Sequence, residues 1–142
     1  MTQLFANNAA SELANAVTSG ATSLTLKAGG GALFPAPTVD DFFLVTLYQK
    51  VGQDEANHEI VKCTARTGDV LTVVRAQEGT VAVAWPSATA AQLRVTAGTL
   101  GSFTAADEAT QTALNAKAPL TGTGASGNWS INAATATKLA TA

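Results

Sequence analysis

Residues 24–96 carry short runs of valine, leucine, threonine and phenylalanine, separated by glycine, proline or aspartate at intervals of about 8 to 15 residues. This pattern is typical of an antiparallel β domain. After Gly98 it gives way to alanine-rich sequence with helical spacing. We therefore expect a β domain at residues 1–98, a short helix with its linker at residues 99–119, and an extended segment at residues 120–142.

The clearest strand pattern lies at residues 92–96, where Leu93 and Val95 share one face of a half-buried strand. Residues 24–27 predict a shorter strand that ends at the three glycines of residues 29–31. Residues 42–48 are apolar on both faces and rich in aromatic and β-branched side chains, which predicts a central strand.

Residues 59–66 and 70–75 predict a hairpin, because Thr67, Gly68 and Asp69 between them are turn-forming residues. Residues 70–75 are apolar on both faces, which again favours a central strand. The first strand of the hairpin alternates, and its inward set is expected to be Val61, Cys63 and Ala65. The first twenty residues fit either a helix or a strand, and we favour an extended segment.

Residues 105–117 predict a helix. Thr104 is placed to cap its N-terminus, and Asp107 and Glu108 would then lie in the positive first turn. Pro119 stops the helix, because the residue before a proline is pushed out of helical geometry. The apolar stripe consists mainly of alanine, which suits close packing of identical helices in a parallel bundle.

Residues 120–142 are rich in glycine, threonine and alanine and predict no compact fold. Trp129 and Ile131 fall on one face of a potential strand. A segment of this kind gains order by pairing or packing with other chains.

Small side chains dominate the composition. The chain is 46% apolar but only 6% aromatic and 13% charged, and thirty of its 142 residues are alanine. We expect a thin core, and hence self-association to offset the conformational entropy of folding. Eight scattered basic residues and a net charge of −2 form no patch for nucleic acid. No secretory signal and no apolar run of about 18 residues is seen, so membrane insertion is not expected.

Catalytic chemistry has few candidates. His58 and Cys63 are five residues apart, an odd offset that places them on opposite faces of one strand. Lys27 precedes the glycines of residues 29–31, whereas a phosphate-binding loop has its lysine after them. Asp40–Asp41 and Asp54–Glu55 lack the spaced oxygen ligands of a calcium loop. We expect no enzyme activity, no cofactor and no metal, and a single cysteine forms no intrachain disulfide.

Five stretches of the chain form a distinctive combination, and together they span most of it. They are QLFANNAA at residues 3–10, GALFPAP at 31–37, EIVKCTAR at 59–66, LTVVRAQEGT at 71–80 and GNWSINAATATKLATA at 127–142. The first four resemble the N-terminal domain of tailed-bacteriophage tail-fibre proteins, and the fifth resembles the short repeat of fibre shafts.

The resemblance implies a homotrimeric structural component of the virion, assembled in the host cytoplasm, whose N-terminal domain docks on tail or baseplate proteins. The sequence ends where shaft repeats would normally continue, so a short adaptor that carries a second, longer fibre protein is one expected form. The expected fold is mainly β: an antiparallel sandwich or barrel-like domain, then a short helix in a three-chain bundle, then the fibre-like segment.

The residues expected at the three-fold axis share apolar or small side chains: Phe103, Ala106, Thr110, Ala113, Leu114, Leu120, Trp129 and Ile131. An alternative function is a carbohydrate-binding module that contacts host-surface glycan through Trp85, since an exposed tryptophan can stack on a sugar ring. For both Trp85 and Trp129 we favour burial over sugar contact.

Overall fold

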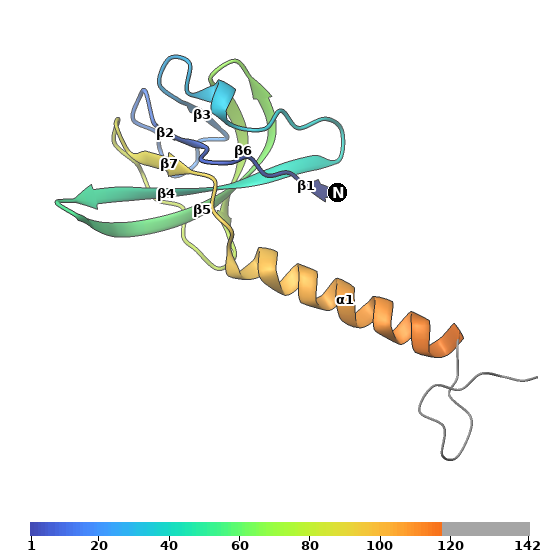
Figure 1. Cartoon of the computed structure of the whole chain (residues 1–142). Helices are drawn as coiled ribbons and strands as arrows, with labels where there is room; N and C mark the ends of the chain where they lie inside the picture. The colour runs from blue at the N-terminus through green and yellow to red at the C-terminus, as the bar shows by residue number, and fades with distance from the viewer. Residues whose placement is uncertain (118–142) are drawn as a thin grey trace, which may run out of the picture. The chain divides into compact units, whose positions relative to one another are not determined.

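The computed structural model describes residues 1–117, with the backbone alone for Asn115 and Lys117. Two compact units divide the chain: the first is Met1–Thr96, and the second begins at Ala97 (Figure 1). Leu120, Trp129 and Ile131 lie outside the described residues, as does the expected segment at residues 120–142. The elements are β1 (Thr2–Gln3), β2 (Ala10–Glu12), β3 (Ser23–Thr25), η1 (Gly31–Leu33), β4 (Asp41–Val51), β5 (Asp54–Thr67), β6 (Val70–Gln77), β7 (Ala90–Gln92) and α1 (Ala97–Lys117).

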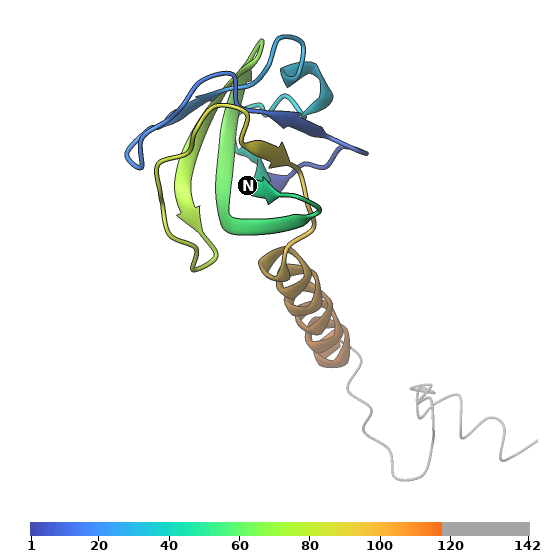
Figure 2. The same cartoon turned by 90° about the vertical axis from the view of Figure 1, so that its left-hand side faces the viewer.

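The first unit is one curled, mainly antiparallel sheet with the strand order β2-β7-β4-β5-β6-β3, and β1 adds to β4 in parallel. Register shifts in the pairing of β4, β5 and β6 mark bulges, which bend strands. The sheet therefore curls into a half-barrel (Figures 1 and 2). An antiparallel bridge between Leu13 and Leu26 links its two outer strands. The expectation of a mainly β, barrel-like domain is confirmed, as far as the curled single sheet shows it. The sandwich alternative is wrong for the described residues, because their strands form one sheet.

The core lies on the concave side of the curled sheet. Phe34 and Phe43 supply much of its bulk, and their rings stack with centroids 5.9 Å apart. Around them pack aliphatic side chains and one tryptophan, and the buried set is Ala9, Leu13, Leu24, Leu26, Phe34, Phe43, Val45, Leu47, Val61, Cys63, Leu71, Val73, Trp85 and Ala91.

Three strand predictions are confirmed. Residues 42–48 lie within β4, which pairs with β5 and β7 and is buried from Phe43 to Tyr48. Residues 59–66 lie within β5, with Val61 and Cys63 fully buried and Ala65 partly buried. The first twenty residues are extended, with β1, β2 and the bridges at Leu13 and Val17.

The strand predicted at residues 92–96 is wrong, because β7 covers Ala90–Gln92 instead. Leu93 does pack partly against the core, but Val95 is 60% exposed. The true strand was hidden by alanine, whose short side chain carries little signal of burial. Ala90 and Ala91 are both buried.

The strand predicted at residues 70–75 exists as β6 and lies between β5 and β3, as expected of a central strand. It is not buried on both faces. Leu71 and Val73 are buried, whereas Val70 and Val74 are 40% and 52% exposed. A half-barrel has one core, on its concave side, so the other face of β6 lies at the surface.

The glycines of residues 29–31 bind a carboxylate of this chain. Gly31 N and Gly29 N donate to the two oxygens of Asp69, at 2.8 and 3.0 Å. A Cβ atom at Gly31 would lie 2.1 Å from the carbonyl oxygen of Gly68, so no larger residue fits. These two hydrogen bonds therefore hold the glycine loop against the turn between β5 and β6.

The helix α1 begins at Ala97, eight residues before the predicted start. Thr104 is not its cap, because its hydroxyl donates to the carbonyl of Gly101 at 2.9 Å within the helix. Asp107 and Glu108 consequently lie mid-helix, and the first turn holds no acid. The helix runs through Gly98 and Gly101, since a glycine costs a helix only about 1 kcal/mol.

Candidate functional site

The first candidate surface is the apolar face of α1. Leu100, Phe103 and Leu114 are each 58% exposed. Positions 100, 103 and 114 fall on one side of a helix, because three and fourteen residues correspond to nearly one and four full turns. Large apolar side chains on one exposed face make this side of α1 a candidate contact surface.

The predicted interface residues within the described chain are all exposed on α1: Phe103, Ala106, Thr110, Ala113 and Leu114. The first four are spaced by three, four and three residues, which is the seam pattern of a helical bundle, and Leu114 lies four residues after Thr110. Sequence reasoning missed Leu100, because it placed that residue in a linker. The signal that could have found it is its three-residue spacing to Phe103.

The second feature is a buried charge cluster around Glu59 of β5. Glu59 is fully buried, and its two carboxylate oxygens accept hydrogen bonds from Arg75 at 2.7 Å each. The indole N–H of Trp85 donates to it at 2.8 Å, and the amide of Ala76 donates at 3.1 Å. Arg75 also donates to the carbonyl of Thr18 at 2.8 Å. The cluster therefore ties together parts of the chain that are distant in sequence.

Two opposing effects act on the pKa of Glu59. Burial raises it, but hydrogen bonds from Arg75, Trp85 and Ala76 lower it, and the net pKa lies below the usual value. The carboxylate is therefore charged at neutral pH, and both of its oxygens accept hydrogen bonds. The signal that could have found Glu59 is its position on the inward face of β5, two residues before Val61 and four before Cys63.

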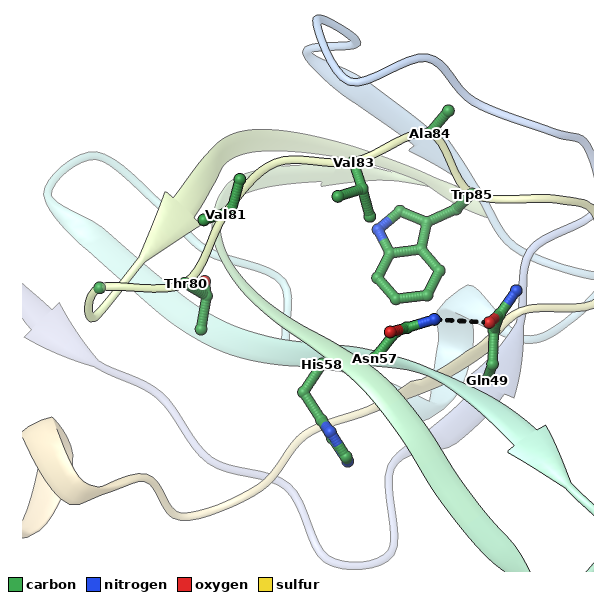
Figure 3. A pocket seen from close by; sticks show the side chains of 9 residues that line it. Gln49, Asn57, His58, Thr80, Val81, Val83, Ala84 and Trp85 are labelled. Carbon is green, nitrogen blue, oxygen red and sulfur yellow. Dashed lines mark hydrogen bonds between the residues drawn. The ribbon is translucent and has the colours of Figure 1, made fainter.

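A pocket of about 430 Å³ opens beside this cluster (Figure 3). Its lining has no aspartate, glutamate, lysine or arginine, and consists of Gln49, Asn57, His58, Gly79, Thr80, Val81, Val83, Ala84 and Trp85. Asn57 donates from its side-chain amide to Gln49 at 2.9 Å. Trp85 is only 2% exposed and its N–H is engaged by Glu59. Such a ring offers no face for stacking on a sugar, which argues against Trp85 as a glycan contact.

A third cluster joins residues 92–94 to the β4–β5 hairpin. Arg94 donates to both oxygens of Glu55, at 2.8 and 2.6 Å, and its guanidinium lies 4.4 Å from the centre of the Tyr48 ring. Hydrogen bonds from Arg94 and then His58 lower the pKa of Glu55 to about 2. Both carboxylate oxygens of Glu55 are therefore already engaged by Arg94, and Glu55 is not a free calcium ligand.

The His58–Cys63 pair is not a catalytic dyad. Cys63 is fully buried, and this burial raises the pKa of its thiol to about 12, so the reactive thiolate does not form at neutral pH. His58 instead stacks on Tyr48 with ring centroids 6.0 Å apart and bonds to Glu55 at 3.2 Å. Within residues 1–117, no three histidine, cysteine, aspartate or glutamate side chains are grouped to hold a metal ion.

No protein-family model matches the chain, and no curated protein matches it. Within the described part of the chain, no helix combines the length and apolar character required to cross a bilayer.

Proposed function

We propose that this chain is a structural component of a bacteriophage tail fibre, or an adaptor at the base of one. Its β domain docks on a tail or baseplate protein, and α1 joins three copies so that they carry or begin the host-attachment fibre. The proposal draws on the sequence resemblance. The observation that carries it is the exposed apolar face of α1, with Leu100, Phe103 and Leu114.

The chemistry of α1 supports close packing of identical helices. Ala106 and Ala113 alternate with Phe103 and Thr110 along the expected seam. Small side chains let helix axes approach, and the larger ones fill the space between them. Closed three-fold symmetry repeats each weak contact three times, and each contact raises the effective concentration for the next.

The mechanism is mechanical and needs no reactive group. The ionised clusters of the β domain support this role, because Arg75 with Glu59 and Arg94 with Glu55 tie the chain to itself. The glycan-binding alternative has no comparable support, since Trp85 is buried.

Two measurements test the proposal. Light scattering of the purified full chain should give three times the single-chain mass of 14.3 kDa. Antibodies against the chain should label the tails of particles of the phage that encodes it, with particles of an unrelated phage as the control. A single-chain mass at high micromolar concentration, or unlabelled tails, would refute it.

A further inference from the structure

One edge of β5 has no strand partner over part of its length. On one side β5 pairs with β4 from Asp54 to Cys63. On the other side β6 pairs with it only from Ile60 to Thr67. Residues 54–59 therefore have strand neighbours on one edge only, within the part of the chain that the structure describes. In an antiparallel pair, alternate residues turn their N–H and C=O groups away from the partner, so this edge presents unpaired backbone groups.

The segment that follows β6 is also unpaired where it passes this edge. Thr80 anchors it, because the Ile60 amide donates to the Thr80 hydroxyl at 3.1 Å. Beyond Thr80 the chain reads Val-Ala-Val-Ala, and Val81 is 72% exposed and Val83 39% exposed. Of the four amides at residues 81–84, only that of Val83 donates within the described residues, to Glu59 at 3.4 Å.

The pocket lies between these two unpaired stretches, because Asn57 and His58 of β5 line one side and residues 79–85 line another (Figure 3). Val81, Val83 and Trp85 occupy alternate positions and are increasingly buried in that order. Natural proteins protect such edges with charged side chains, proline, β-bulges or a covering element. The edge of β5 carries Asp54, Glu55 and Glu59, and a bulge at Asn57. Glu55 and Glu59 are already ion-paired with Arg94 and Arg75, so they do not face the edge as free charges. Residues 80–84 contain neither lysine nor proline, and no charged residue at all.

We propose that this edge and pocket, the β5 slot, receive an extended and uncharged strand of a partner polypeptide by β-augmentation. The strand pairs with the backbone of residues 54–58 and places small apolar side chains against Val81 and Val83. The partner's identity as a tail or baseplate protein rests on the proposed function. The expected binding of an extended, uncharged strand does not depend on that function.

The lining decides what kind of partner fits. A pocket lined by no aspartate, glutamate, lysine or arginine offers little compensation for desolvating a charged segment, so the matching strand is neutral where it enters. Unpaired N–H and C=O groups recognise an extended backbone, whereas a helix has already used its own. Val81 and Val83 at the side of the pocket then favour a small apolar side chain on the strand.

Hydrogen exchange on the full chain tests the β5 slot. The probe is a blocked hexapeptide of alternating threonine and valine, and its control has proline in place of the third and fourth residues. The first peptide should slow exchange of amides in residues 54–58 at least fivefold. The proline peptide should have no effect, because it cannot complete the ladder.

Two protein variants separate the pocket from general surface effects. Val81→Asp should weaken binding of the first peptide at least tenfold. The matched variant Val39→Asp, at a position that is 90% exposed and not among the pocket residues, should leave it unchanged. Both side chains are largely exposed, so neither variant should unfold the domain.

Four outcomes would overturn the β5 slot: no protection by the first peptide, equal protection by the proline peptide, equal effects of the two variants, or protection that rises with protein concentration alone. The last would mean that a second copy fills the slot. The measured mass of the chain is independent of all four. Failure here therefore leaves the trimer untouched, and failure of the trimer leaves this test intact.

Discussion

Replacing Leu114 with aspartate should dissociate the proposed trimer. Leu114 is 58% exposed in the single chain, and complete burial of a leucine contributes about 1.5–3 kcal/mol. Covering the exposed 58% therefore contributes about 1–1.7 kcal/mol per chain. Three copies around one axis give about 3–5 kcal/mol per trimer, before the repulsion between three carboxylates is counted.

A loss of about 3–5 kcal/mol lowers the association constant by about a hundredfold to several thousandfold. Light scattering across a dilution series should show Leu114→Asp with the mass of one chain at concentrations where the unmodified protein is trimeric. The matched control is Thr112→Asp, two residues away on the opposite side of α1, where the hydroxyl donates only to the Glu108 carbonyl. Circular dichroism checks that both variants keep their helix.

An unchanged mass for Leu114→Asp over the whole series would show that Leu114 does not lie in the interface. Equal dissociation by both variants would show that added charge acts on α1 in general. Either result would refute the assignment of this helix face to the three-fold axis.

Three further predictions concern the β domain. Gly31→Ala should destabilise it by about 1–3 kcal/mol in denaturant titrations, because the new Cβ meets the Gly68 carbonyl, whereas Gly20→Ala, with open space around it, should not destabilise it. Glu59→Gln should cost about 3–5 kcal/mol, since it leaves Arg75 buried without its charged partner. The lowered pKa of Glu59 predicts full stability above about pH 4.5 and a falling thermal midpoint as the pH drops through the folded-state pKa. Glu59→Gln should flatten that acid limb, and an identical limb in the variant would contradict this.

The strands predicted well were those with large alternating or continuous apolar side chains. Phe43, Val45 and Leu47 place β4 in the core, and Val61 and Cys63 orient β5, because burial of bulky side chains dominates local preference. β7 was not predicted, because Ala90 and Ala91 are small and contribute almost no hydrophobic pattern. Leu93 and Val95 alternate with polar residues as in a strand, but both lie after the end of β7.

The candidate sites were harder to predict because they depend on contacts distant in sequence. Glu59 and Arg75 meet only after β5 and β6 pair, and Trp85 joins them from a segment with no regular structure. The start of α1 was missed because Thr104, followed by Asp107 and Glu108, matched the pattern of an N-terminal cap. The β5 slot exists because β6 pairs with β5 only from Ile60 onward. The hydrophobic pattern of residues 54–59 does not predict where that pairing stops.

The buried thiol of Cys63 has a practical consequence. Because it is shielded from solvent and resists ionisation, maleimide reagents at neutral pH should leave it unmodified. A cysteine introduced at position 110 in place of threonine would then be the only thiol of the chain that reacts with maleimide. Spin labels or fluorophores attached there could report distances between copies without first removing the native sulfur.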